Sequence, residues 1–175
     1  MRDFLGRAGK REYAVLAAVL LLAVAAYAPT LVSSFHFDDH AILADPHLTS
    51  PDGWWRVFRP QQTRPLTYFT FWVNHRLGEA NPRGYHAVNL AIHLLTGLML
   101  FTLVRETLLS PRFKGRHAAL AGDVAFATAV IWVVHPLGTQ AVTYVVQRSE
   151  SLMALFFLVT LYCVNRAART EGVLR

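Results

Sequence analysis

Four apolar stretches divide the chain, and polar, aromatic-rich or basic segments separate them. A helix needs about 20 apolar residues to cross the hydrocarbon core of a bilayer. We predict transmembrane helices over residues 13–33, 85–108, 118–136 and 151–165, the last two short but strongly apolar. The pattern therefore predicts an all-α integral membrane protein in which residues 1–175 form a single membrane domain.

The first apolar stretch allows two interpretations. Basic residues precede it, and Ala26-Tyr27-Ala28 resembles the A-x-A cleavage site of a signal peptide. The apolar residues continue past that site to Val32, which favours a retained anchor. In both interpretations the segment that follows faces the same side of the membrane.

Residues 35–84 form a loop between the first two predicted spans, and loops of this length usually carry function or structure of their own. Ser50-Pro51-Asp52 has the residue types of a helix N-terminus and predicts a helix near residues 51–58. Arg64-Pro65 predicts a second helix near residues 65–78, with Gly78 as its C′ stop.

Both short helices carry apolar side chains in a pattern that favours a membrane surface. Leu66, Phe69, Val73 and Leu77 form one apolar stripe on the second helix. Trp54 and Trp55 lie on the first, and tryptophan is enriched at membrane interfaces. We therefore predict two interfacial helices on the outer surface. A small soluble cap with internally packed aromatic residues is the alternative.

Composition and charge agree with this arrangement. Only 16% of the residues are charged, against about 25% in average soluble domains. The net charge of +6 lies between apolar runs rather than on one soluble face, so we expect no nucleic-acid partner. Basic residues concentrate in cytoplasmic loops, and here they gather in residues 1–12, 109–118 and the C-terminal tail. Both termini are therefore predicted to be cytoplasmic, with residues 35–84 and 137–150 outside.

The candidate chemistry begins with Phe37-Asp38-Asp39-His40, directly after the first span. Adjacent carboxylates repel each other, so stability alone does not favour such a pair. The motif is either a polar turn where the chain leaves the membrane or a site held at the membrane surface.

A second set of polar groups lies on the second predicted span. His86, Asn89 and His93 share one helical face, and polar groups at this depth usually face the bundle interior or a wet cavity. We predict that this face points into the bundle, and a stripe of helix–helix hydrogen bonds is the simplest interpretation. A metal ion needs three or more ligands, which one helical stripe rarely supplies.

Polar residues also flank the last two spans. His135-Pro136 ends the third span at its outer end, and Arg148-Ser149-Glu150 precedes the fourth. Glu150 suits the first turn of a helix on dipole grounds alone, and a functional role is the alternative.

Three sequence blocks together resemble a known family. They are Phe37-Asp38-Asp39, the segment from Arg64-Pro65-Leu66-Thr67 through Asn81-Pro82-Arg83-Gly84-Tyr85-His86-Ala87-Val88-Asn89 to His93, and the segment from His135-Pro136 to Arg148-Ser149-Glu150. In order and spacing they resemble the start of the transmembrane and tetratricopeptide-repeat (TMTC) proteins and their bacterial relatives. Those proteins are GT-C membrane glycosyltransferases related to protein O-mannosyltransferases, and the resemblance covers roughly residues 13–165.

The resemblance implies transfer of a sugar from a polyprenyl-phosphate carrier to a hydroxyl of a protein or glycan on the outer side. Asp38 or Asp39 would be the general base, and the sequence does not choose between them. Arg64 and Arg148 are candidates to bind the lipid phosphate, because arginine binds phosphate in bidentate fashion. The remaining candidate substrate-binding residues are His40, His86, Asn89, His93, His135 and Glu150.

The resemblance also sets expectations for partners and location. Membrane lipid, the lipid-linked donor, the acceptor and other membrane subunits are the expected partners. We assign no cofactor and no metal ligands, although a divalent ion is compatible with the acids. The membrane would be the inner or plasma membrane in a bacterium and the endoplasmic reticulum in a eukaryote.

Two departures from the family keep other functions open. Family members continue through many more spans, whereas this chain stops after the fourth, so a non-catalytic or truncated multi-pass subunit is one alternative. The family commonly has an acid after the His-Pro block, where this chain has Gln140. A b-type haem protein is a further alternative, in which His93 would need a partner histidine at similar depth.

Overall fold

The fold was analysed in a computed structural model that describes residues 10–59, 63–113 and 115–170. Every regular element in this part of the chain is a helix, as predicted. The residues fall into two compact units, where the sequence suggested a single domain. Unit 1 comprises residues 1–26, 94–136 and 154–175, and unit 2 comprises residues 27–93 and 137–153. Two long helices, α7 (Pro82–Leu108) and α10 (Arg148–Thr170), contribute to both units.

Proline and asparagine residues set the helix ends that the sequence placed only approximately. Helix α2 (Lys10–Tyr27) gives way to the 3₁₀ helix η1 (Ala28–Val32), in which Pro29 occupies a first-turn position. Helix α7 begins three residues before the predicted start, because Asn81 Oδ1 accepts a hydrogen bond from the Arg83 N–H (3.1 Å) and Pro82 opens the helix. Helix α8 (Ala121–Val134) ends before His135-Pro136, where the residue preceding proline is extended.

Unit 1 is held together by small and branched apolar residues. Ala23 of α2 and Val133 of α8 are buried, and Leu94 of α7 packs against them. At Gly97 of α7 an added Cβ would lie 2.4 Å from Val133 Cγ2, so this glycine permits close approach of α7 and α8. Near the other end of α7, Arg169 Nη1 of α10 pairs with Glu106 Oε2 at 2.9 Å.

Among the described residues, two helices are long and apolar enough to cross a membrane. They are Pro82–Leu108 and Arg148–Arg169. Helix α8 is followed directly by the short helices η3 (Pro136–Gly138) and α9 (Thr139–Thr143). These helices make a third candidate if α8 and the bent segment Pro136–Thr143 together form one broken span. The apolar helical segment Leu20–Val32, which includes η1, is shorter than these candidates. The 3₁₀ helix η2 (Pro111–Phe113) lies in the connection between α7 and α8.

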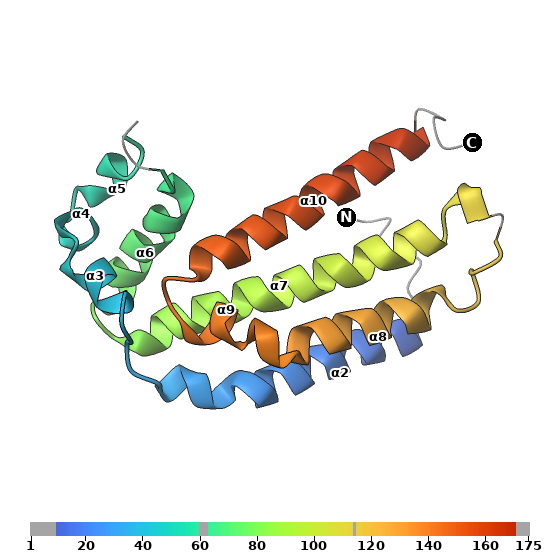
Figure 1. The fold of residues 1–175 in the computed structure, drawn as a ribbon, viewed down its shortest axis with the longest axis horizontal. Coiled ribbons are helices and arrows are strands. Elements are labelled where there is room, and N and C mark those ends of the chain that lie inside the picture. The colour runs from blue at the N-terminus through green and yellow to red at the C-terminus, as the bar shows by residue number, and fades with distance from the viewer. Residues whose placement is uncertain (1–9, 60–62, 114, 171–175) are drawn as a thin grey trace. The chain divides into compact units, whose positions relative to one another are not determined.

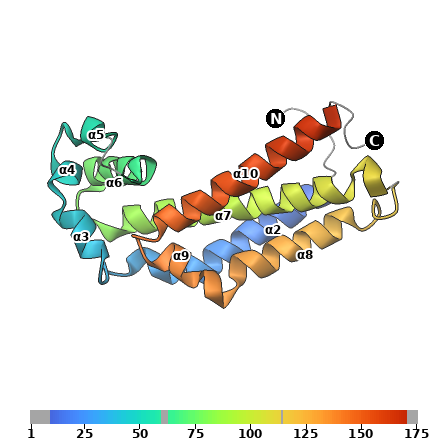
Figure 2. The same ribbon diagram turned by 45° about the horizontal axis from the view of Figure 1, so that its top comes forward.

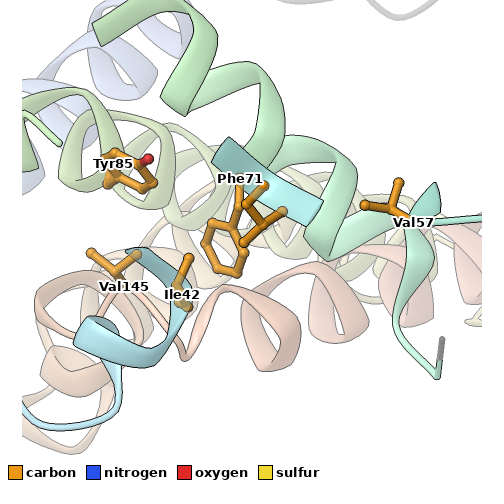
Figure 3. Packing of buried hydrophobic residues seen from close by; sticks show 6 residues of the cluster. Ile42, Val57, Phe71, Tyr85 and Val145 are labelled. Carbon is orange, nitrogen blue, oxygen red and sulfur yellow. The ribbon is translucent and has the colours of Figure 1, made fainter. Parts of the chain in front are cut away.

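In its described residues, unit 2 contains four helices from the loop between the first two predicted spans. They are α3 (Asp39–Ala44), α4 (Pro46–Thr49), α5 (Gly53–Arg56) and α6 (Pro65–Gly78), which gather in Figures 1 and 2. Their core joins Ile42, Leu48, Val57 and Phe71 to Tyr85 of α7 and Val145 (Figure 3). The loop is therefore structured, and two of its four helices were not predicted.

The predicted helix at 51–58 is wrong in its start and length. Ser50 is the C-cap of α4, and α5 begins only at Gly53. A Cβ at Gly53 would lie 1.7 Å from the His47 carbonyl oxygen, so α4 and α5 pack too closely for any other residue. Trp72 of α6 also holds this turn, because its Nε1–H donates to the Ser50 carbonyl (3.1 Å).

Helix α6 begins at Pro65 as predicted but differs at its end. Gly78 is still helical, and Glu79 takes the positive φ of 50° instead. The apolar stripe, predicted to face the membrane surface, is not the face that packs within unit 2, and Leu66 and Leu77 are 43% and 83% exposed. The buried residues of α6 are Thr67, Phe71 and Asn74. Helix α6 turns its polar side inward because that side binds a buried arginine.

Candidate functional site

Asp39 anchors the acidic turn, by which we mean residues 36–39. Its side chain is fully buried in unit 2. Oδ2 accepts the His36 N–H at 3.2 Å and Oδ1 accepts the Val146 N–H at 2.9 Å. Both oxygens are thus bound by backbone donors, which ties the acidic turn to the segment before α10.

Asp38 differs from its neighbour in every one of these respects. It is exposed, and its side chain makes no capping or other hydrogen bond within the described ranges. The preceding Phe37 is 80% exposed and has φ = 44°, a conformation that costs a bulky residue free energy. Strained, exposed backbone of this kind clusters at functional sites. His40, in the first turn of α3, is also exposed.

Arg64 lies at the N-terminus of α6 and connects to the acidic turn through two residues. Its Nη1–H donates to Ser149 Oγ (3.1 Å), and Ser149 Oγ–H donates to the Val146 carbonyl (3.4 Å). The N–H of Val146 in turn binds Asp39. Arg64 is exposed, and its other guanidinium N–H groups have no partner in the described part of the chain. An anion could therefore bind there.

Arg148, expected to bind lipid phosphate, is instead fully buried. Its guanidinium donates to side chains of α6 and α7 and to a backbone carbonyl, and it lies 4.5 Å from the Phe71 ring centre. Four of its five N–H groups already have acceptors, and its burial keeps it away from a phosphate. The arrangement thus presents Arg64, and not Arg148, to a ligand.

The polar face of α7 is buried, as the sequence predicted. His86, Asn89 and His93 all lie inside unit 2. Asn89 accepts from Arg148 Nε–H (2.7 Å) and donates through Nδ2–H to the Tyr144 carbonyl (2.9 Å). The ring of His93 packs edge-on against Tyr27, with centroids 5.4 Å apart. Neither ring nitrogen of His86 has a hydrogen-bond partner among the residues described.

The two remaining candidates lie at helix ends. His135 is the exposed C-cap of α8 in unit 1. Glu150 is exposed in the first turn of α10, where the helix dipole favours an acid. Within the described ranges, no group of three or more His, Cys, Asp or Glu side chains could hold a metal ion. The edge contact of His93 with Tyr27 does not favour haem ligation.

Sequence reasoning missed three groups that build the site: the side chains of Thr70 and Asn74 and the N–H of Val146. Asn74 could have been found, because a polar residue inside an apolar aromatic helix usually has a partner. The Val146 amide left no signal, since every residue except proline carries one.

The fold and the site first define a class: a membrane protein, helical throughout its described residues, in which the loop of residues 35–84 folds against the start of a long apolar helix. Comparison with known proteins then specifies the family. The chain is 30% identical over 172 residues to a protein O-mannosyl-transferase of Caenorhabditis elegans, covering 89% of this chain and 24% of that protein. It is 31% identical over 166 residues to protein O-mannosyl-transferase TMTC2 of Mus musculus, covering 86% of this chain and 18% of that protein.

A third relative is protein O-mannosyl-transferase TMTC1 of Homo sapiens, 38% identical over 104 residues, which cover 59% of this chain and 11% of that protein. No protein-family model and no solved structure matches the chain. The family resemblance is confirmed, and the chain is TMTC-like. It spans about a quarter or less of the length of these relatives.

Proposed function

We propose that this chain forms the donor- and acceptor-facing membrane portion of a GT-C-type glycosyltransferase. The enzyme would move a sugar from a polyprenyl-phosphate carrier to a hydroxyl of a protein or glycan outside the membrane. The observation that supports it best is that, within the described residues, the unbonded carboxylate of Asp38 and the exposed guanidinium of Arg64, bonded only to Ser149, are connected through Asp39, Val146 and Ser149. The naming of the relatives as O-mannosyl-transferases favours mannose as the sugar.

Asp38 is the residue we assign as general base. An acceptor hydroxyl is a weak nucleophile until a base removes its proton. The carboxylate of Asp38 takes that proton while the hydroxyl oxygen attacks the anomeric carbon of the sugar. The bond from the anomeric carbon to the phosphate oxygen breaks, and the polyprenyl phosphate leaves with the electron pair. Asp39 keeps the turn in place, since both of its oxygens already accept hydrogen bonds.

Arg64 is the residue we assign to the leaving phosphate. In the full-length protein we expect Arg64→Gln to weaken binding of polyprenyl-phosphate mannose and to raise its KM about tenfold or more, because a charge-assisted contact is lost. Transfer of mannose to a peptide and binding of the lipid donor are both measured in reconstituted vesicles. Arg76→Gln is the matched control, because Arg76 is exposed on the same helix and forms no ion pair within the described ranges. A purified full-length protein that transfers no sugar from any polyprenyl-phosphate donor would contradict the function.

We also propose four spans with both termini cytoplasmic and the helices of the outer loop at the membrane surface. The exposed side chains of Trp54, Trp55 and Phe58 support this placement, because aromatic residues favour the interface. The ring of Trp55 lies 4.6 Å from the Arg59 guanidinium carbon, which leaves a cation beside the aromatic surface for lipid headgroups.

Cysteine labelling tests the orientation. In a Cys163→Ser background, we expect an impermeant maleimide outside the membrane to label Thr63→Cys and not Ala118→Cys. Thr63 and Ala118 are both exposed, so each thiol can react when it faces the reagent. Ala118 is preferable to Gly115, whose φ of 74° disfavours a side chain. Labelling of Ala118→Cys alone would mean that the orientation is inverted.

A further inference from the structure

We propose that Arg148 is a positioning residue: through Asn89 and the turn at residues 144–148, it fixes Asp39 and with it the acidic turn. Arg148 is the centre of a hydrogen-bond network that joins α6, α7 and the start of α10. We call the set Thr70, Asn74, Tyr85, Asn89 and Arg148 the arginine cage. The proposal rests on the proposed function only where it concerns catalysis.

Residues of the arginine cage accept hydrogen bonds from four of the five guanidinium N–H groups of Arg148. Nε–H donates to Asn89 Oδ1 (2.7 Å), and Nη2–H donates to the Tyr85 carbonyl (2.9 Å). Nη1–H groups donate to Asn74 Oδ1 (2.7 Å) and Thr70 Oγ1 (3.2 Å). The guanidinium carbon lies 4.5 Å from the centre of the Phe71 ring. Four of the five N–H groups thus have acceptors, and the side chain is fully buried, so it is not accessible to a ligand.

All four acceptors in the arginine cage are neutral. Among the described residues, the guanidinium forms no ion pair with an Asp or Glu side chain. Burying a charge without a counter-ion carries a large desolvation cost, which apolar packing would avoid. A planar, weakly hydrated guanidinium reduces that cost and offers donors in fixed directions. Directional donors specify where α6, α7 and the 144–148 turn lie, which apolar side chains would not do.

The network reaches the acidic turn through one side chain and one turn of backbone. Asn89 binds Arg148 with its oxygen and the Tyr144 carbonyl with its Nδ2–H. Two hydrogen bonds close the 144–148 turn, from the N–H of Gln147 to the Tyr144 carbonyl and from the N–H of Arg148 to the Val145 carbonyl. Inside this turn the Val146 N–H holds Asp39 Oδ1. A shift of Asn89 or Arg148 therefore moves the group that fixes Asp39.

A positioning role and a phosphate-binding role predict different kinetics. A residue that binds the donor phosphate raises the donor KM when it is replaced. A residue that only places the turn lowers kcat and leaves the donor KM unchanged, because Arg64 still binds the phosphate. Misplacement of a catalytic group by about 1 Å can cost about 10²-fold in rate.

Asn89→Asp separates the two halves of the network. The carboxylate still accepts from Arg148 Nε–H, so the arginine keeps its partners and the fold is retained. The Nδ2–H to the Tyr144 carbonyl is lost. In the full-length protein we expect kcat to fall about 10- to 100-fold with an unchanged donor KM and an unchanged melting temperature or a higher one.

Amide hydrogen exchange tests the same claim without any activity. With Asn89→Asp we expect faster exchange in peptides covering residues 141–148 and 36–45, and unchanged exchange in α6. Arg148→Lys keeps the charge but cannot supply the planar fork, so exchange in α6 should also become faster. Helix α8, in unit 1, is the internal reference in both variants.

Three outcomes would overturn the proposal. The first is parent-like exchange at residues 36–45 in both variants. The second is a raised donor KM with an unchanged kcat in Arg148→Lys, which would make Arg148 a phosphate ligand. The third is parent-like hydrogen exchange and a parent-like kcat in Arg148→Lys, which would mean that a positive charge alone is enough to position the acidic turn. If the parent enzyme transfers no sugar, the proposed function fails while the exchange experiment still decides on the network.

Discussion

Asp38→Asn in the full-length protein is expected to lower the rate of sugar transfer by about 10²–10⁴-fold, the typical cost of losing a general base. The amide has nearly the same shape as the carboxylate but does not accept the proton of the acceptor hydroxyl. Asp38 makes no side-chain hydrogen bond in the described part of the chain, so the replacement leaves the acidic turn intact. Initial rates with a saturating lipid donor, beside a donor-binding assay, measure the effect.

The neighbouring acid and a surface acid serve as controls for this prediction. Asp39→Asn removes one of two backbone contacts, because an amide can accept only one of the His36 and Val146 N–H groups. Its loss of rate should therefore come with faster amide exchange in the turn, whereas Asp38→Asn should leave exchange unchanged. Asp52→Asn, an exposed acid paired with Arg56, should transfer at the parent rate. Parent-like transfer by Asp38→Asn would mean that the motif is only a polar turn.

The long helices were predictable because their causes are local. A continuous apolar stretch predicts α7 and α10 from composition alone, and Pro65 fixes the start of α6, whereas the start of α7 at Pro82 was missed by three residues. The buried polar face of α7 followed from its 3.6-residue period. The short helices α3 and α4 escaped prediction because each is held by turns and by contacts with the rest of unit 2 more than by its own sequence pattern.

The site was predictable in its residue types but not in its roles. The sequence identified Asp38 and Asp39 as a pair, yet the choice between them depends on Val146, which lies 107 residues from Asp39. The orientation of α6 depended in the same way on Arg148, which reaches Asn74 across 74 residues. The sequence pattern showed the apolar stripe of α6 but gave no sign that the opposite face, with Thr67, Phe71 and Asn74, packs inside unit 2. Arg148 sets the orientation of α6, because a buried arginine without acceptors would cost more free energy than leaving leucines exposed.

Arg148→Met is expected to lower the free energy of unfolding by about 3–5 kcal/mol, because it leaves buried acceptors without donors. Methionine fills much of the volume and keeps the contact with Phe71, but it offers no N–H to Asn74 or Asn89. Unfolding in increasing sodium dodecyl sulfate, followed by circular dichroism, gives the change. Arg83→Met is the matched control, because Arg83 is exposed and the change there should fall within about 0.5 kcal/mol.

A second replacement shows whether Arg148→Met destabilises the protein through unsatisfied hydrogen-bond acceptors or through lost packing. Asn74→Leu alone removes a partner from Arg148 and should destabilise the protein by about 1–3 kcal/mol. In the Arg148→Met background the same change removes an acceptor that has no donor, so it should cost less or even restore stability. The sum of the two single-variant changes in unfolding free energy should therefore exceed the change in the double variant by at least about 1 kcal/mol, as is typical of residues in contact within one network. Additive effects would mean that Arg148 stabilises unit 2 through packing alone, and that its hydrogen bonds to α6 contribute little.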